Sequence, residues 1–448
     1  MTYLKPTFSA IKNLILLVIV FALISSCANN NSNWPQFRGP NSNQIADGRD
    51  LPLEWSPENN LAWKYDLQGR GWSSPIVWGN KVFFTNAVLE DPSILPPARE
   101  GTRLENPDSV VYNFEVVCLD INTGEELWKK IAYHGLPTYK THRDNNYAPE
   151  TMVCDGEHVY AYFGMTGVYC YDMEGNPVWE ADLGTYPMQA GWGTATSPLL
   201  YNGILYLQID NEEYSFLAAL DAKTGVEKWR VDRDEKSNWG TPMIWKNSVR
   251  TELITPGVKT RSYNPQTGEL NWFINTGGGR NSASPTADGD MIYFGNEKRG
   301  SDGGTLFGVK AGASGDITLN EGEVSNEFVV WSVQNSGIMM ASPLVYEGLL
   351  YLVDRRQGKL SCFEAASGNV VYPAARLADA KAFWASPWAY DGNIYCLEEK
   401  GTTHVIQAGR ELKVIRMNKL PADIYWATPA IANDTYIFRG EKGIYCVR

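Results

Sequence analysis

Short apolar segments alternate with turn residues along nearly the whole chain, and the pattern recurs about every 40–50 residues. In the repeat that begins at Ala195, this alternation predicts four strands with a hairpin turn at Asn202-Gly203. The expected strands are residues 196–201, 204–209, 216–220 and 226–231. Each repeat opens with a small residue and a proline. The eight pairs are Ser74-Pro75, Ala148-Pro149, Ser197-Pro198, Thr241-Pro242, Ser284-Pro285, Ser342-Pro343, Ser386-Pro387 and Thr428-Pro429.

The outer strand of a repeat follows an Asp or Asn turn that ends in glycine, as in residues 120–124 and 221–225, and it carries a tryptophan. This tryptophan recurs too regularly to be catalytic, and we expect it to dock against the neighbouring repeat, where a large buried ring stabilises the joint. The expected docking tryptophans are Trp63, Trp128, Trp179, Trp229, Trp272 and Trp331.

The last repeat stops one strand short, and residues 61–64 at the other end of the chain supply a strand with its tryptophan. Pairing the two ends closes a ring and removes its exposed edges. The sequence therefore predicts an all-β fold, an eight-bladed β-propeller whose last blade is closed by an N-terminal strand. A β-sandwich array and a seven-bladed ring are the alternatives, and the repeat count disfavours both. The Gly-rich insertion at residues 310–328 is predicted to be a flexible excursion.

The first 26 residues resemble a lipoprotein signal peptide, with Lys5 and Lys12 ahead of a short apolar run. The sequence before Cys27 resembles a lipobox, which implies cleavage there and a lipid on Cys27. An ordinary secreted protein is the alternative. Residues 27–33 are expected to form a lipidated tether, and residues 34–448 the propeller. The formal net charge of −12 argues against nucleic acid as a partner.

Cysteines at equivalent strand positions, such as Cys118, Cys170 and Cys362, are too far apart for disulfides and are interpreted as small buried apolar residues. Neither a Cys-x-x-Cys-His motif nor an adjacent cysteine pair occurs in the sequence. His142 and its neighbours match no established ligand spacing, so no metal site and no catalytic residue is predicted.

The residues just before each innermost strand should line the mouth of the central funnel, together with polar ends of second strands. The candidate funnel residues are Trp72, Trp192, Trp239, Trp384, Trp426, Asp354, Arg355, Asn296 and Glu297. The tryptophans either fill the narrow end of the ring or form an aromatic platform for a ring-shaped ligand or a peptide. The charged residues either form solvated loop ends or make a polar rim around that platform.

The Asp-x-x-Thr-Gly-x-x-x-Trp signature, with residues 34–40 and 69–75, resembles the pyrroloquinoline quinone (PQQ) repeat propellers, specifically the BamB-like lipoproteins of outer-membrane assembly. This resemblance covers about residues 34–448 and implies a non-catalytic envelope platform without a cofactor. The resemblance also implies that a lipid anchors the protein in the outer membrane, facing the periplasm, and that its partners are envelope proteins. The alternative class is a PQQ- and Ca²⁺-dependent dehydrogenase of alcohols or sugars. A carbohydrate-binding propeller, with a glycan or another small molecule on the tryptophans, is a third reading.

Overall fold

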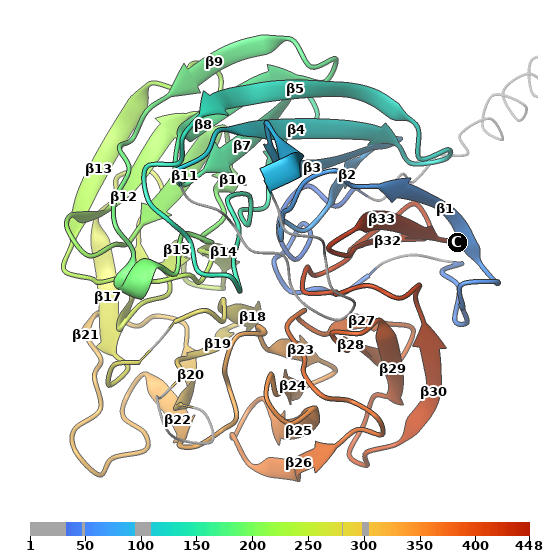
Figure 1. Ribbon diagram of the computed structural model, residues 1–448. Helices are drawn as coiled ribbons and strands as arrows, with labels where there is room; N and C mark the ends of the chain where they lie inside the picture. The colour runs from blue at the N-terminus through green and yellow to red at the C-terminus, as the bar shows by residue number, and fades with distance from the viewer. Residues whose placement is uncertain (1–32, 47–49, 95–108, 280, 298–303) are drawn as a thin grey trace, which may run out of the picture.

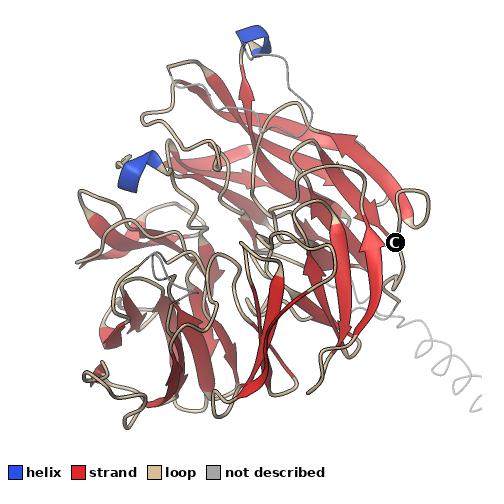
Figure 2. Ribbon diagram, turned by 60° about the horizontal axis from the view of Figure 1, so that its bottom comes forward, coloured by secondary structure: helices blue, strands red, loops and turns tan. Residues whose placement is uncertain are grey.

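The computed structural model describes residues 33–46, 50–94, 109–279, 281–297 and 304–448. They form eight small sheets around a central axis, like the blades of a propeller (Figure 1). Strands make up nearly all of the regular structure (Figure 2), and the helical elements of these residues are the short η1 (Pro92–Ile94) and η2 (Gln189–Gly191). The prediction of an all-β eight-bladed propeller is confirmed.

The expected signal peptide, residues 1–26, and Cys27 lie outside the described residues, as does all of the tether except residue 33. Within the described part of the chain, no helix is long and apolar enough to cross a membrane.

In blades one to seven, four antiparallel strands follow the chain from the axis outward. Blades one to four contain β2 (Ile76–Trp78), β3 (Lys81–Leu89), β4 (Tyr112–Asp120) and β5 (Glu126–Gly135); β6 (Val153–Cys154), β7 (His158–Phe163), β8 (Gly167–Asp172) and β9 (Pro177–Ala181); β10 (Leu199–Tyr201), β11 (Ile204–Ile209), β12 (Ser215–Asp221) and β13 (Glu227–Arg233); and β14 (Met243–Lys246), β15 (Thr251–Thr255), β16 (Lys259–Tyr263) and β17 (Leu270–Asn275). Blades five to seven contain β18 (Thr286–Asp288), β19 (Met291–Gly295), β20 (Leu306–Lys310) and β22 (Val329–Val333); β23 (Leu344–Tyr346), β24 (Leu349–Val353), β25 (Lys359–Glu364) and β26 (Val370–Arg376); and β27 (Trp388–Tyr390), β28 (Asn393–Leu397), β29 (Thr402–Gln407) and β30 (Val414–Lys419).

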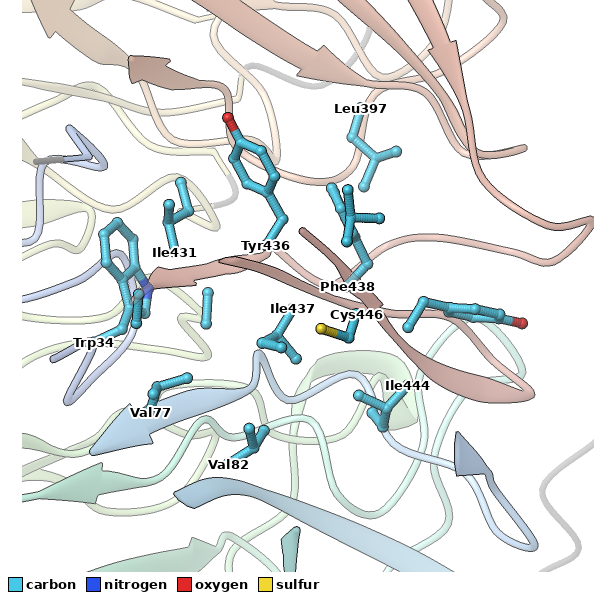
Figure 3. Packing of buried hydrophobic residues seen from close by; sticks show 14 of the residues in the cluster. Trp34, Val77, Val82, Leu397, Ile431, Tyr436, Ile437, Phe438, Ile444 and Cys446 are labelled. Atoms are coloured by element: carbon cyan, nitrogen blue, oxygen red, sulfur yellow. The ribbon is translucent and has the colours of Figure 1, made fainter. Parts of the chain in front are cut away.

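Blade eight is built from both ends of the chain, as the sequence predicted. Its inner strands are β31 (Ala430–Ala432), β32 (Thr435–Arg439) and β33 (Gly443–Val447), and β1 (Leu61–Asp66) pairs antiparallel with β33. Ile437, Ile444 and Cys446 share one buried apolar cluster with Val77 and Val82 of blade one (Figure 3). The closing joint is therefore a continuous core. All six cysteines of the described residues are buried and form no disulfide.

In five blades the outer-strand tryptophan lies against the turn glycine of the next blade. These pairs are Trp63 with Gly124, Trp128 with Gly175, Trp179 with Gly225, Trp229 with Gly268 and Trp331 with Gly368. The contact leaves no room for a side chain, since a Cβ on Gly225 would come within 2.6 Å of the Trp179 ring. The Trp179 Nε1 also donates to the Ala222 carbonyl of the next blade, at 2.9 Å.

Trp272 departs from this arrangement. Its Nε1 donates to the buried Glu252 carboxylate of its own blade, at 2.7 Å. Its outer side is occupied by the insertion of blade five, in which β21 (Gly315–Asp316) pairs parallel with β17. Ile317 of this segment is buried, so the prediction of a flexible excursion at residues 310–328 is wrong. The insertion adds a fifth strand to the edge of blade four.

The segment at residues 34–46 crosses the axis beneath the ring. Trp34 forms a bridge with Val77 of blade one, and Ile45 forms one with Ala389 of blade seven. Between them, Arg38 is 1 % exposed. Its guanidinium donates to two backbone carbonyls, those of Pro285 at 2.7 Å and Pro343 at 2.8 Å, in blades five and six. This segment contains residues 34–40, one of the two motifs that carry the resemblance in the sequence.

We predict that Gly225→Ala lowers the thermal unfolding midpoint more than Gly203→Ala does. Both glycines have a left-handed φ, +70° and +72°, so each substitution costs about 1–2 kcal/mol in the backbone. Only at residue 225 does the new Cβ also collide with an indole ring, which adds about 1–3 kcal/mol. Residue 203 is the matched control because nothing lies within 4 Å of its Cβ position. Equal shifts of the midpoint in the two variants would contradict the docking contact.

Candidate functional site

The residues that precede the innermost strands surround a cavity of about 200 Å³ at one end of the axis. All five tryptophans predicted for the funnel line it, together with Arg355 and residues that the sequence did not single out. The lining residues are Phe37, Trp72, Ser74, Asp144, Asn145, Pro149, Thr151, Trp192, Ala195, Ser197, Trp239, Thr241, Ser282, Ser284, Met340, Ser342, Arg355, Trp384, Ser386, Trp426, Ala427 and Thr428. We call this cavity the mouth.

Three tryptophans from consecutive blades stack along one wall of the mouth. Trp384 and Trp426 have ring centroids 3.8 Å apart with planes 14° apart, and Trp426 and Trp72 are 4.8 Å apart. The guanidinium carbon of Arg355 lies 5.0 Å from the Trp384 ring, which places a cation at the end of the stack. Each of the three indoles stands two residues before the Ser or Thr of its own repeat, so the repeat itself places them at equivalent heights.

Trp192 and Trp239 come from the loops that lead into blades three and four. The Trp239 Nε1 donates to the Gly193 carbonyl at 2.8 Å, which fixes one indole against the loop that carries the other. His142 stacks on Trp192 with centroids 3.9 Å apart. Both tryptophans are half-buried, so each keeps part of its ring surface accessible.

The other predicted polar residues do not line the mouth but support the loops around it. The buried Glu297 carboxylate accepts from Arg356 at 2.9 Å and lies 3.9 Å from Arg355. Asp354 caps its own turn by accepting from the backbone N–H of Arg356. Asn296 donates to the Thr276 hydroxyl at 3.1 Å. Arg355 is therefore the member of this polar group that reaches the cavity.

The floor of the mouth is a ring of eight hydroxyl groups, one from each blade, which we call the hydroxyl crown. Its members are Ser74, Thr151, Ser197, Thr241, Ser284, Ser342, Ser386 and Thr428, and each is at most 7 % exposed. The sequence shows seven of them as residues before proline. In the sequence these residues indicate only the starts of strands, because one chain in isolation does not show that the eight positions meet at the axis.

In blade two the repeat begins later than the sequence predicted. The pair Ala148-Pro149 was expected to open this repeat, but the crown position is Thr151, followed by Met152 in place of proline and then by β6. The requirement at the axis is for a hydroxyl group, and alanine has none. Reading the repeat from its prolines therefore placed this boundary three residues early.

Within the described chain, every crown hydroxyl except that of Ser74 joins two blades, because it accepts the backbone N–H of the crown residue in the preceding blade. Seven such bonds occur, from Ser74 to Thr151 (2.9 Å), Thr151 to Ser197 (2.9 Å), Ser197 to Thr241 (3.1 Å), Thr241 to Ser284 (2.9 Å), Ser284 to Ser342 (2.9 Å), Ser342 to Ser386 (3.0 Å) and Ser386 to Thr428 (3.1 Å). At the eighth joint, Arg439 of blade eight donates to the Ser73 carbonyl and to the Thr85 carbonyl of blade one.

Two buried guanidinium groups adjoin the crown, Arg38 at residues that follow it and Arg439 at a residue that precedes it. Arg38 and Arg439 are at most 1 % exposed, and their hydrogen bonds within the described chain go to carbonyl, hydroxyl and amide oxygens, with no carboxylate among them. Burial lowers the pKa of each to about 9, which still leaves both groups protonated at neutral pH. The floor of the mouth therefore carries positive charge in a protein whose net charge is −12.

A buried acid adjoins the crown at Glu150, which is 1 % exposed. Burial raises the pKa of its carboxyl to about 7, because the charged form loses its water. Its Oε1 accepts from the Gly164 N–H at 3.4 Å, and its Oε2 has no hydrogen-bond partner among the described residues. At neutral pH about half of this carboxyl is therefore protonated, so it carries less negative charge than an ordinary glutamate.

Comparison with known proteins agrees with the observed architecture. The sequence pattern of the family described as "Outer membrane protein assembly factor BamB" matches residues 113–371, more than half of the chain. No curated protein matches the chain. Among solved structures, BamB from Moraxella catarrhalis has 11% identity and a TM-score of 0.52, over 81% of this chain and 98% of that one.

Quinohemoprotein alcohol dehydrogenase from Comamonas testosteroni has 12% identity and a TM-score of 0.61, over 95% of this chain and 82% of that one. The computationally designed Ika8 protein has 10% identity and a TM-score of 0.54, over 90% of this chain and 100% of that one. At such identities these likenesses concern the fold alone, because one scaffold hosts unrelated functions.

We predict that Glu150→Gln flattens the dependence of thermal stability on pH. A carboxyl whose pKa is raised in the folded state holds its proton there while the unfolded chain releases it, so wild-type stability falls as pH rises from about 4.5 to 7. The variant lacks this loss, which is about 3 kcal/mol at most. Unfolding midpoints from pH 5 to 8 measure it, with the exposed Glu411→Gln as the control. Parallel profiles for wild type and Glu150→Gln would contradict the raised pKa.

Proposed function

The chain belongs to the family of the outer membrane protein assembly factor BamB, and from this membership we propose that it is a non-catalytic binding and assembly platform of the cell envelope. Its partners in this role are envelope proteins, and the mouth is the surface that receives them. A lipid on Cys27 would anchor it to the outer membrane, facing the periplasm.

The observation that supports this proposal is the composition of the mouth. It combines half-buried indoles with Arg355 and Asn145 at the rim, and such rigid aromatic surfaces with a few polar groups are typical of binding sites. The indoles are held by stacking and by the Trp239 hydrogen bond rather than by flexible loops alone. A partner that docks here therefore meets a surface already in its binding conformation, which lowers the entropic cost of association.

The described lining residues do not fit a centre of PQQ and Ca²⁺. Calcium takes six to eight oxygen ligands, usually with several carboxylates. Asp144 is the one carboxylate among the lining residues, and it lies 3.8 Å from Arg143 and 3.9 Å from His142. The six cysteines of the described residues are buried inside blades rather than at the mouth. The donor set is thus poor for a calcium ion, and the binding platform is the reading that these residues support best.

The path of the N-terminus supports a mouth that is accessible to partners. Asn33 accepts a hydrogen bond from the N–H of Gly79, which follows β2, whereas Ser74 of the mouth precedes β2. The chain therefore enters the ring on the face opposite to the mouth. A tether that leads from this point to a membrane would direct the mouth away from the membrane surface.

We predict that cells lacking this protein contain less assembled outer-membrane protein, and that Trp192→Ala/Trp239→Ala fails to restore the level. The double substitution removes two aromatic faces of the mouth, and losing such anchors commonly costs more than 2 kcal/mol of binding. Quantitative proteomics of the outer-membrane fraction measures the effect.

The matched control is Val226→Ala on the outside of blade three, where Val226 is 65% exposed, and it should restore the level fully. Thermal unfolding of each purified variant shows whether the propeller is intact. Full restoration by the double variant would contradict a role of the mouth. An unchanged outer-membrane fraction in cells without the protein would contradict the assembly role itself.

A further inference from the structure

The hydroxyl crown has unused hydrogen-bond donors that face the cavity. Seven of its oxygens already accept a backbone N–H, so each of these has given up acceptor capacity but still has its own O–H proton. Among the described residues, no crown hydroxyl donates a hydrogen bond to a protein acceptor. All eight hydroxyl groups line the cavity. A ligand on the floor therefore meets a ring of donors and few acceptors.

The buried positive charges next to the crown favour the same kind of ligand. Arg38 donates to the carbonyls of Pro285 and Pro343, which directly follow two crown serines. Arg439 donates to the carbonyl of Ser73, which directly precedes Ser74. Both cations thus lie one residue away from the crown. In a poorly solvated interior their attraction for an anion is weakened far less than it would be in water.

The carboxylates around the floor do not cancel this field. Glu297 is paired with Arg356 and lies near Arg355 at the rim, and Glu441 is paired with the buried Arg70 at 2.9 Å. Burial raises the pKa of Glu150 to about 7, so this carboxyl is only about half ionised at neutral pH. Asp144 lies near Arg143 and His142. The donors and the unpaired charge therefore act together at the centre of the mouth.

We propose that the hydroxyl crown binds the carboxylate or phosphate group of a small ring-bearing ligand, whose ring lies against the tryptophans above it. The inference rests on the proposed function of the mouth as a binding surface and names the chemistry of what enters it. The volume of about 200 Å³ suits a single substituted ring. Oxyanion oxygens accept several O–H donors at once, and indole faces stack on flat rings.

Calorimetric titration of the purified protein, residues 28–448, tests the proposal with pairs of ligands of which one carries an anionic group and the other is neutral. The pairs are glucose 6-phosphate with glucose, and benzoate with benzamide, and inorganic phosphate serves as the bare anion. We expect at least one anion to bind about tenfold or more tightly than its neutral partner, with affinity that falls as salt is added. The pair that shows the preference identifies phosphate or carboxylate as the anion. Equal binding within both pairs, or no binding by any anion, would overturn the proposal.

Ser74→Ala is the most informative variant, because Ser74 accepts no backbone N–H among the described residues whereas Ser197 does. Ser74→Ala should leave the unfolding midpoint unchanged and weaken anion binding about fivefold to tenfold. Ser197→Ala should weaken binding similarly and also lower the midpoint. Ser325→Ala, at an exposed residue of the loop before β22, is the control, with affinity and midpoint both unchanged. Anion affinity that survives both crown substitutions would overturn the assignment to the crown.

If the neutral ligands bind as tightly as the anions, the crown proposal is contradicted but the proposed role as a binding platform is not. The envelope measurement above is made in cells and uses no added ligand. A normal outer-membrane fraction in cells without the protein would reject the assembly role, whatever the titration shows. The two failures are therefore distinguishable.

Discussion

The backbone N–H that points from one blade to the next at the axis is the group on which the ring depends. It is buried where no strand partner can reach it, and a buried donor without an acceptor costs about 1–3 kcal/mol. The hydroxyl of the next crown residue accepts it at seven joints, as from Ser197 to Thr241. In seven blades a proline follows, which has no N–H and so leaves no second donor to satisfy.

A second set of contacts between blades lies at the outer edge of the propeller, where an outer-strand indole packs on the turn glycine of the next blade. Neighbouring blades are therefore held together both near the axis and at the outer edge. In blade three, for example, Ser197 bonds to Thr241 near the axis, and Trp179 of blade two packs on Gly225 at the outer edge. Where the indole is redirected, at Trp272, the added strand β21 covers the edge of the blade instead. These contacts between blades make the mouth rigid, because they hold its loops at fixed separations.

Charge is distributed unevenly between the surface and the axis. The protein as a whole is acidic, yet Arg38 and Arg439 are buried at its centre and bonded to neutral oxygens. Arg38 reaches its place only because residues 34–46 cross under the ring. The N-terminal segment therefore does more than connect a tether to blade one. It forms part of the floor through Phe37 and sets the electrostatic character of the mouth.

The sequence by itself determined the elements of the propeller, because strand alternation, turn glycines and repeat length are local properties. It identified the number of blades, a closing strand at residues 61–64, which the structure extends to residue 66, and the tryptophans of the mouth. It could not show that Asn296, Glu297 and Asp354 support loops instead of lining the cavity, since second-strand ends follow no period that fixes their direction. It also placed the opening of blade two at Ala148 rather than near Thr151. The crown, the buried arginines and the strand β21 were decided by the tertiary structure alone, because each arises where blades distant in sequence meet and satisfy one another's buried polar groups.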